Sequence, residues 1–143
     1  MPPPDSNAID TALVSKLWND SALRALMPGG VYFDYAPANM DRFVIVSLDA
    51  SDDVPRFNGR AIESARYLVK AVQRATGRDD VAEAAARIDV LLEDQTLTAA
   101  GYGCVACYRE ERVRFVEVDD LDASIRWQHR GAHYRIQMTP LVE

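Results

Sequence analysis

Four residues have types and spacings that could support metal or redox chemistry. Cys104 and Cys107, the two cysteines of the sequence, are spaced as C-x-x-C, and His129 and His133, its two histidines, are spaced as H-x-x-x-H. Two cysteines and two histidines are a common ligand set for structural zinc. A C-x-x-C pair with a lowered thiol pKa is a common redox centre. The third possibility is that the cysteines are two small residues of a strand.

The spacing disfavours both chemical interpretations. Twenty-one residues separate Cys107 from His129, whereas the zinc-finger signature has about a dozen there. The cysteines fall in a strand pattern, in which residues three apart point to opposite faces, and reactive C-x-x-C thiols usually sit at a helix N-terminus. We therefore predict two structural cysteines, no bound metal and no cofactor. The histidines are predicted to be surface residues beside a tight turn at Gly131.

Other polar motifs predict no chemistry either. "DDLDAS" at 119–124 lacks the glycine and distal glutamate of a calcium loop and is predicted to be a solvated acidic turn. "GYG" at 101–103 is too short to cradle a phosphate, and no Lys-Ser/Thr pair follows it. Arg109, Arg112 and Arg114 could bind an anion, or they could form the exposed charged face of a strand. We predict no catalytic residue and no enzymatic activity.

Length and charge narrow the classes of protein. The 143 residues are long enough for one domain, predicted over residues 6–143 after a flexible proline-rich leader at 1–5. A net charge of −6 and a pI near 4.9 make sequence-independent nucleic-acid binding improbable. The sequence shows neither an apolar run of the roughly 20 residues that span a bilayer nor a signal peptide. An intracellular setting without a membrane partner is the simplest expectation.

Helical periodicity is clearest in three segments. Ile9, Leu13 and Leu17 recur at i+4 with Ser6 or Asn7 as the cap. A short helix follows Asp20, a second N-cap candidate, and stops at "PGG". A third helix is predicted at 80–94, with a capping box from Asp80 to Glu83 and an i,i+4 pair from Glu83 to Arg87. Its apolar stripe contains the following residues: Val81, Ala84, Ala85, Ile88, Leu91 and Leu92.

Period-two patterns predict strands at 31–35, 42–48, 104–109, 113–118 and 132–138. "RFVIVSL" at 42–48 is apolar on both faces, which favours an inner strand. Residues 61–72 fit either a helix or a two-sided strand, and periodicity does not decide between them.

The segment 49–60, "DASDDVPRFNGR", is predicted to be a long exposed loop, and long loops often carry function. Its acidic and basic residues are candidate partner-binding residues, because their alternation suits charge pairing with a neighbouring subunit. These are Asp49, Asp52, Asp53, Arg56 and Arg60. The alternative is a loop that has no partner.

Several stretches follow one another in an order typical of one family. They are "RYLVKAV", "AAARIDVLLED", "YGCVACYREERVRFVEVDD" and "RWQHRGAHYRIQM", preceded by "ALMPGGVYFDYAP" and "RFVIVSL". In this order the chain resembles the tail terminator, or tail-completion, proteins of long-tailed bacteriophages and of gene transfer agents. The resemblance covers most of the chain and depends on a shared pattern rather than on a catalytic signature.

This resemblance implies an α+β fold with one mostly antiparallel sheet and helices packed on one face, and it implies a strand at 61–72. It also implies a homohexameric ring in the tail or neck of a virion, assembled in the host cytoplasm. Such a ring caps the tail tube, stops its polymerisation and offers a surface for head–tail joining. The expected partners are a second copy of the chain, the tail tube protein and a head-completion or connector protein, while DNA passes through the lumen without specific binding.

Three other interpretations remain open from the residues. The chain could be a head-closure or connector protein of the same particle, or a non-catalytic intracellular protein-binding module. A small hydrolase or metal-dependent enzyme is the third. For the ring, sheet edges at 31–35 or 132–138 are predicted to pair between neighbours.

Overall fold

The computed structural model describes residues 4–57, 59–75 and 79–141. Within these ranges the chain forms three helices and six strands, which confirms the predicted α+β class. The elements in chain order are α1 (Asn7–Trp18), α2 (Ser21–Leu26), β1 (Val31–Phe33), β2 (Arg42–Ser51), β3 (Val54–Arg56), β4 (Gly59–Arg74), α3 (Asp80–Leu92), β5 (Tyr102–Val118) and β6 (Arg126–Pro140). None of the helices in the described ranges has the length and apolar character needed to cross a membrane.

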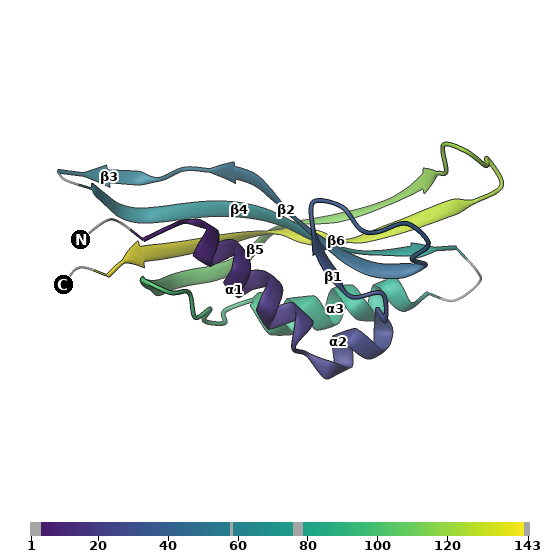
Figure 1. The fold of residues 1–143 in the computed structure, drawn as a ribbon, viewed down its shortest axis with the longest axis horizontal. Helices are drawn as coiled ribbons and strands as arrows, with labels where there is room; N and C mark the ends of the chain where they lie inside the picture. The colour runs from purple at the N-terminus through teal and green to yellow at the C-terminus, as the bar shows by residue number, and fades with distance from the viewer. Residues whose placement is uncertain (1–3, 58, 76–78, 142–143) are drawn as a thin grey trace.

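The strands form one mixed sheet in the order β1-β2-β4-β6-β5, and β3 pairs with the start of β4. Strand β1 runs parallel to β2, and the other pairs of neighbours are antiparallel. Strands β4, β5 and β6 contain 16, 17 and 15 residues, which corresponds to roughly 50 Å each. Figure 1 shows that these strands extend past the helices at both ends, as a β3–β4 hairpin on one side and a β5–β6 hairpin on the other.

Segment 61–72, which periodicity left ambiguous, is a strand, as the family resemblance implied. It lies in β4, between β2 and β6. Val69 and Ala71 belong to the main core, and the next residue, Val72, which points to the opposite face, is also buried. Apolar residues on both faces, which a central strand requires, explain why the pattern resembled a helix.

The helices contribute the predicted apolar stripes to the core. Ile9, Leu13 and Leu17 of α1 are buried, and the stripe of α3 buries Ile88 and Leu92 completely. Two polar contacts join helices to central strands: Tyr67 in β4 donates a hydrogen bond to Asp10 of α1, and Tyr134 in β6 donates to Asp89 of α3. A buried phenol needs such a partner because an unsatisfied polar group is costly.

The predicted cap of α2 is confirmed, and that of α1 is not. Asp20 accepts a hydrogen bond from the Leu23 amide at 2.9 Å. Ser6 precedes α1 but makes no side-chain cap, because its hydroxyl instead donates to Glu63 at 2.5 Å.

The predicted capping box of α3 is wrong. Asp80 lies inside the helix, and its amide donates to the Gln73 side chain at 3.0 Å. The Asp80 carboxylate pairs with Arg42 at 2.7 Å. Arg87, expected to pair with Glu83, binds Asp20 instead. Tertiary partners from β2, β4 and the start of α2 therefore replace the local pairs.

Two strand predictions also need correction. Segments 104–109 and 113–118 form one strand, β5, with irregularities at Val105 and Glu110. Segment 132–138 is not a free edge, because β6 lies between β4 and β5. The outer strands of the sheet are β1 and β5.

Candidate functional site

The two cysteines point to the same face of the sheet, contrary to the prediction. The irregularity at Val105 places Cys104 opposite Met138 and Cys107 opposite Ile136, and these two partners share one face of β6. Cys107 is buried in the core, and burial raises the pKa of its thiol to about 12. A thiol with such a pKa is protonated at neutral pH and is a poor metal ligand or nucleophile.

The histidines do not flank a turn. Gly131 lies within β6, where the strand passes so close to β4 that an added Cβ would lie 2.0 Å from the Val69 carbonyl oxygen. His129 is buried and stacks on Phe115 with 4.3 Å between ring centroids, and its Nε2 lies 3.2 Å from Glu117 Oε1. Burial, together with the nearby charge of Lys70, lowers the pKa of His129.

The cysteines and histidines are not brought together. His129 is opposite Phe115 in the register, at the far end of β5 from Cys107, roughly 20 Å away along the strand. His133 faces Asp49, with 3.4 Å between Nδ1 and Oδ2. Among residues 4–57, 59–75 and 79–141, no group of three potential ligands is close enough to hold a metal ion.

In its described residues, 49–57 and 59–60, the predicted partner-binding segment is a hairpin rather than a loop. Strand β2 continues to Ser51, β3 occupies Val54–Arg56, and β4 begins at Gly59. The polar composition misled the loop prediction because this hairpin extends beyond the helices, where neither face needs to be apolar. We refer to residues 49–60 as the β3 arm.

Four of the five candidate residues form ion pairs within the chain. Asp49 lies 3.6 Å from Arg66 and 3.4 Å from His133, and Asp52 lies 3.4 Å from Arg135. Asp53 pairs with Arg60 at 3.1 Å. Of the five, Arg56 has no ionic partner among the residues that the structure describes.

These pairs belong to a charged network across the sheet that sequence reasoning missed. Arg135 contacts Glu110 at 3.0 Å, and Arg66 lies 3.4 Å from Glu111. The two arginines lie in β4 and β6 and their acidic partners lie in or beside β2 and β5, so that only the pairing register could join them. The Arg135 side chain is only 13% exposed. A network of several charges around such a residue stabilises the strand arrangement more than isolated surface ion pairs do.

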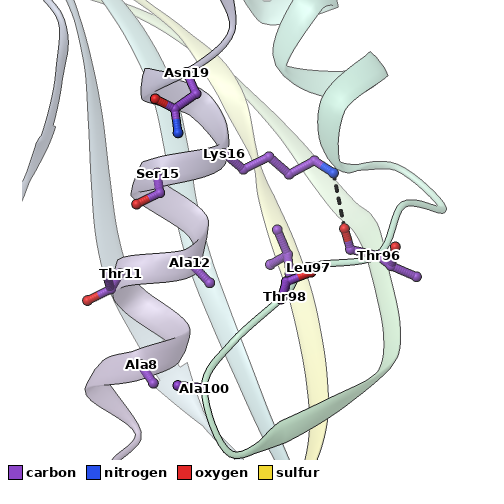
Figure 2. A pocket seen from close by; sticks show the side chains of 10 residues that line it. All are labelled: Ala8, Thr11, Ala12, Ser15, Lys16, Asn19, Thr96, Leu97, Thr98 and Ala100. Carbon is purple, nitrogen blue, oxygen red and sulfur yellow. Dashed lines mark hydrogen bonds between the residues drawn. The ribbon is translucent and has the colours of Figure 1, made fainter.

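A groove of about 610 Å³ separates α1 from the segment that leads into β5. Figure 2 shows that Thr11, Ser15 and Asn19 follow one side of α1, while Lys16 reaches across to the Thr96 carbonyl oxygen, which accepts its hydrogen bond at 3.0 Å. Hydroxyl groups and one lysine already engaged with the backbone supply neither a nucleophile paired with a base nor a charged binding centre.

A second groove, of about 440 Å³, lies between α3 and the β5–β6 pair. Arginines line it. Arg109 of β5 has an acidic partner, Asp89 at 3.3 Å. Arg112, Arg114 and Arg130 form no ion pair with any residue in the described part of the chain. The prediction that the β5 arginines could face an anion therefore stays open. We call this feature the arginine groove.

Comparison with known proteins gives a consistent result. The family model described as tail completion protein gp17 matches residues 11–137. A chain of the virion of a native gene transfer agent particle has a similar structure, with a TM-score of 0.65, 20% identity, and coverage of 92% of this chain and 96% of that chain. A second solved structure gives a TM-score of 0.59 at 14% identity, covering 96% of this chain and 99% of that chain. No curated protein matches the chain.

At these identities the two solved structures show a shared fold alone, and the family match carries the assignment. It confirms the resemblance inferred from the ordered sequence pattern. Because the match spans most of its length, the chain belongs to the tail completion protein gp17 family.

Proposed function

We propose that this structural protein of the virion tail caps the tail tube as a homohexameric ring, stops tube polymerisation and provides the surface for head–tail joining. In this proposal residues 6–143 act as one domain without enzymatic activity. The helices cover one face of a mostly antiparallel sheet and leave the other face and the two hairpin arms for partners.

The extension of the sheet beyond the helices is the observation that carries the proposal. Each arm presents a large apolar side chain at its end: Phe57 in the β3 arm is 92% exposed, and Leu121 in the β5–β6 turn is 98% exposed. Single exposed apolar side chains are common on folded domains, but two of them at the ends of projecting hairpins are in position to be buried at contacts in an assembly. Arms at opposite ends of a protomer suit contacts to different neighbours.

We assign the β3 arm to the tail tube. Asp49, Asp52 and Asp53 stiffen the arm through their ion pairs, so that little conformational freedom is lost on docking. Arg56 and Phe57 at its end would make the contact, with Arg60 held beside Asp53. The head-completion or connector protein would bind the opposite surface of the ring.

A closed ring requires head-to-tail contacts in which two different surfaces of each copy meet. The outer strands β1 and β5 lie at opposite edges of the sheet and supply two different surfaces. The net charge of −6 suits a lumen through which DNA slides without specific binding, because like charges keep phosphate from the wall.

The direct test adds purified protein to growing tail tubes and measures tube ends and lengths by electron microscopy. The proposal expects one ring per tube end and arrested growth. Binding to isolated heads with no effect on tube growth would favour a head-closure or connector role. Failure to bind either structure would leave the interpretation as a protein-binding module.

A further inference from the structure

The arginine groove is basic in a chain that is acidic as a whole. Arg112, Arg114 and Arg130 occupy it without ionic partners in the described ranges, while the net charge of the chain is −6. The one acidic residue of the groove, Asp89, is already engaged: it accepts a hydrogen bond from Tyr134 at 2.9 Å and pairs with Arg109 at 3.3 Å. An unneutralised cluster of like charge disfavours the isolated protomer and favours an anionic partner.

The shape of the groove indicates what that partner looks like. Its wall on the α3 side consists of Ala82, Ala85 and Ala86, and Ala132 lines it from β6. Small apolar residues leave about 440 Å³ open, which is room for an aliphatic side chain. The arginines beside them select carboxylates, to which a guanidinium can donate two parallel hydrogen bonds. The groove therefore fits an apolar side chain flanked by acids.

The turn at 119–122 has this composition. Leu121 is 98% exposed and stands between Asp120 and Asp122. Asp119 holds the turn rigid, because its carboxylate accepts hydrogen bonds from the amides of Leu121 at 3.2 Å and Asp122 at 3.1 Å. It also accepts one from the Trp127 indole at 3.2 Å. A preformed turn loses little conformational entropy on docking. We call residues 119–122 the Leu121 turn.

The Leu121 turn cannot fill the groove of its own chain. Both features belong to the β5–β6 hairpin, and β5 continues from Arg114 to Val118, roughly 13 Å of extended strand, before the turn begins. In Figure 1 this hairpin points away from α3. A contact between the two features must therefore join different copies.

From these complementary surfaces we infer that the Leu121 turn of one copy docks in the arginine groove of the next. The contact is head-to-tail, since each copy offers its turn to one neighbour and its groove to the other, and repetition of such a contact closes a ring or extends a filament. The inference deepens the proposed function and rests on it for the closure into a ring. A second copy of the chain fits better than DNA, because a phosphate backbone has no apolar group for the alanine wall.

Site-directed cross-linking tests the contact. One chain carries Leu121→Cys and a second, differently tagged chain carries Ala86→Cys in the groove, and a short bis-maleimide joins them. The matched control replaces Ala86→Cys by Thr11→Cys, an exposed position in the other groove, beside α1. We expect about tenfold more mixed dimer from the turn–groove pair than from the control. Adding Arg112→Glu and Arg114→Glu to the groove chain should lower the yield of mixed dimer about tenfold, because a close charge pair at an interface contributes at least that much to affinity.

Equal yields for the two pairs, or no effect of the charge reversal, would overturn the inference. Repeating the reaction on rings at tube ends separates it from the proposed function: rings without turn–groove product reject only the contact. Product in solution without rings at tube ends rejects only the tube-capping role. A labelled DNA duplex is the third arm, and binding that Arg114→Glu abolishes would assign the groove to phosphate and overturn the inference.

Discussion

Arg87 of α3 binds the carboxylate of Asp20, the residue that caps α2, with nitrogen–oxygen distances of 2.8 and 2.6 Å. The same carboxylate accepts the hydrogen bond of the Leu23 amide at 2.9 Å. The Asp20 side chain therefore both caps the N-terminus of α2 and joins this helix to α3. The hydrogen bonds from Arg87, more than that from the Leu23 amide, lower the pKa of Asp20 below 3.8.

Substitutions at Asp20 separate these two roles. Asp20→Ala should lower the free energy of unfolding by about 1 kcal/mol through the lost cap, and further through the lost ion pair. Asp20→Asn retains a capping oxygen but not the charge, so urea unfolding should place it between the wild type and the alanine variant. A carboxyl group whose pKa is lower in the folded than in the unfolded chain stabilises the folded state at pH values above the unfolded pKa, and this contribution is lost at lower pH. The difference in free energy of unfolding between wild type and Asp20→Asn should therefore shrink as the pH falls below about 4. A difference that does not depend on pH would contradict the ion pair.

Asp10 should show the opposite dependence on pH. Burial raises its pKa above 3.8, despite the hydrogen bond from Tyr67. A raised pKa favours the folded state below the unfolded value, and this contribution is lost as the pH rises through the folded value. The free energy of unfolding of the wild type, measured relative to Asp10→Asn, should therefore fall as the pH rises above about 4. Asp20→Asn in the same buffers is the control of opposite sign.

Gly131 should tolerate no side chain. An added Cβ would lie 2.0 Å from the Val69 carbonyl oxygen and 2.5 Å from Lys70 Cα, both backbone atoms of the central strand β4. Gly131→Ala must push β4 and β6 apart, and we expect it to cost about 3 kcal/mol. Gly103→Ala is the matched control in β5, because the nearest atoms there lie at 3.5 Å, an ordinary contact distance. Equal midpoints of thermal unfolding for the two variants would contradict the close approach.

Predictability from sequence followed the range of the interactions involved. The stripe of α3 and the buried turns of α1 could be predicted, because a helix repeats its own pattern over many residues. The caps failed at Ser6 and Asp80, since Glu63 and Arg42, both distant in the sequence, bind these side chains. The turn predicted at Gly131 failed for a related reason: the glycine is needed for a neighbouring strand that only the register identifies.

The candidate sites show the same limit. The acidic and basic residues of 49–60 were identified, but their polar pattern indicated a loop, because a hairpin that extends into solvent lacks the apolar alternation of a strand. The bulge at Val105 reversed the predicted relative orientation of the two cysteines. It could not be predicted, because residues 104–107 are all apolar and show no alternation that an extra residue would interrupt. For the arginine groove, the sequence indicates the charged face of β5. It does not indicate that Arg130 of β6 belongs to the same cluster, because this depends on the pairing of Arg114 with Arg130.

Cys107 should behave as a core residue. Its thiol is buried and has a pKa of about 12, so that labelling by a maleimide at about pH 8 should occur only when the chain unfolds. Cys104, which is half-buried, serves as the internal control and should label faster. Peptide mass spectrometry after a short exposure distinguishes the two sites. Rapid labelling of Cys107 in the folded protein would contradict its position in the core.

The end of the β3 arm should determine docking on the tail tube. Phe57 is 92% exposed, and removing an exposed aromatic residue does not disturb the core, so Phe57→Ser should leave the free energy of unfolding within about 0.5 kcal/mol of wild type. An aromatic anchor buried at an interface contributes about 2 kcal/mol or more, which corresponds to a loss of affinity for tube ends of about 30-fold. Arg56→Glu should add to this loss and make docking depend more weakly on salt.

Tyr35→Ser is the matched control, since Tyr35 is also an exposed aromatic residue, at 81%, but follows β1 outside the arm. The measurement is the fraction of tube ends that carry a ring in electron micrographs as the protein is titrated. If Phe57→Ser occupies tube ends at the same concentration as wild type and Tyr35→Ser, the β3 arm does not contact the tube, even if the rings themselves form.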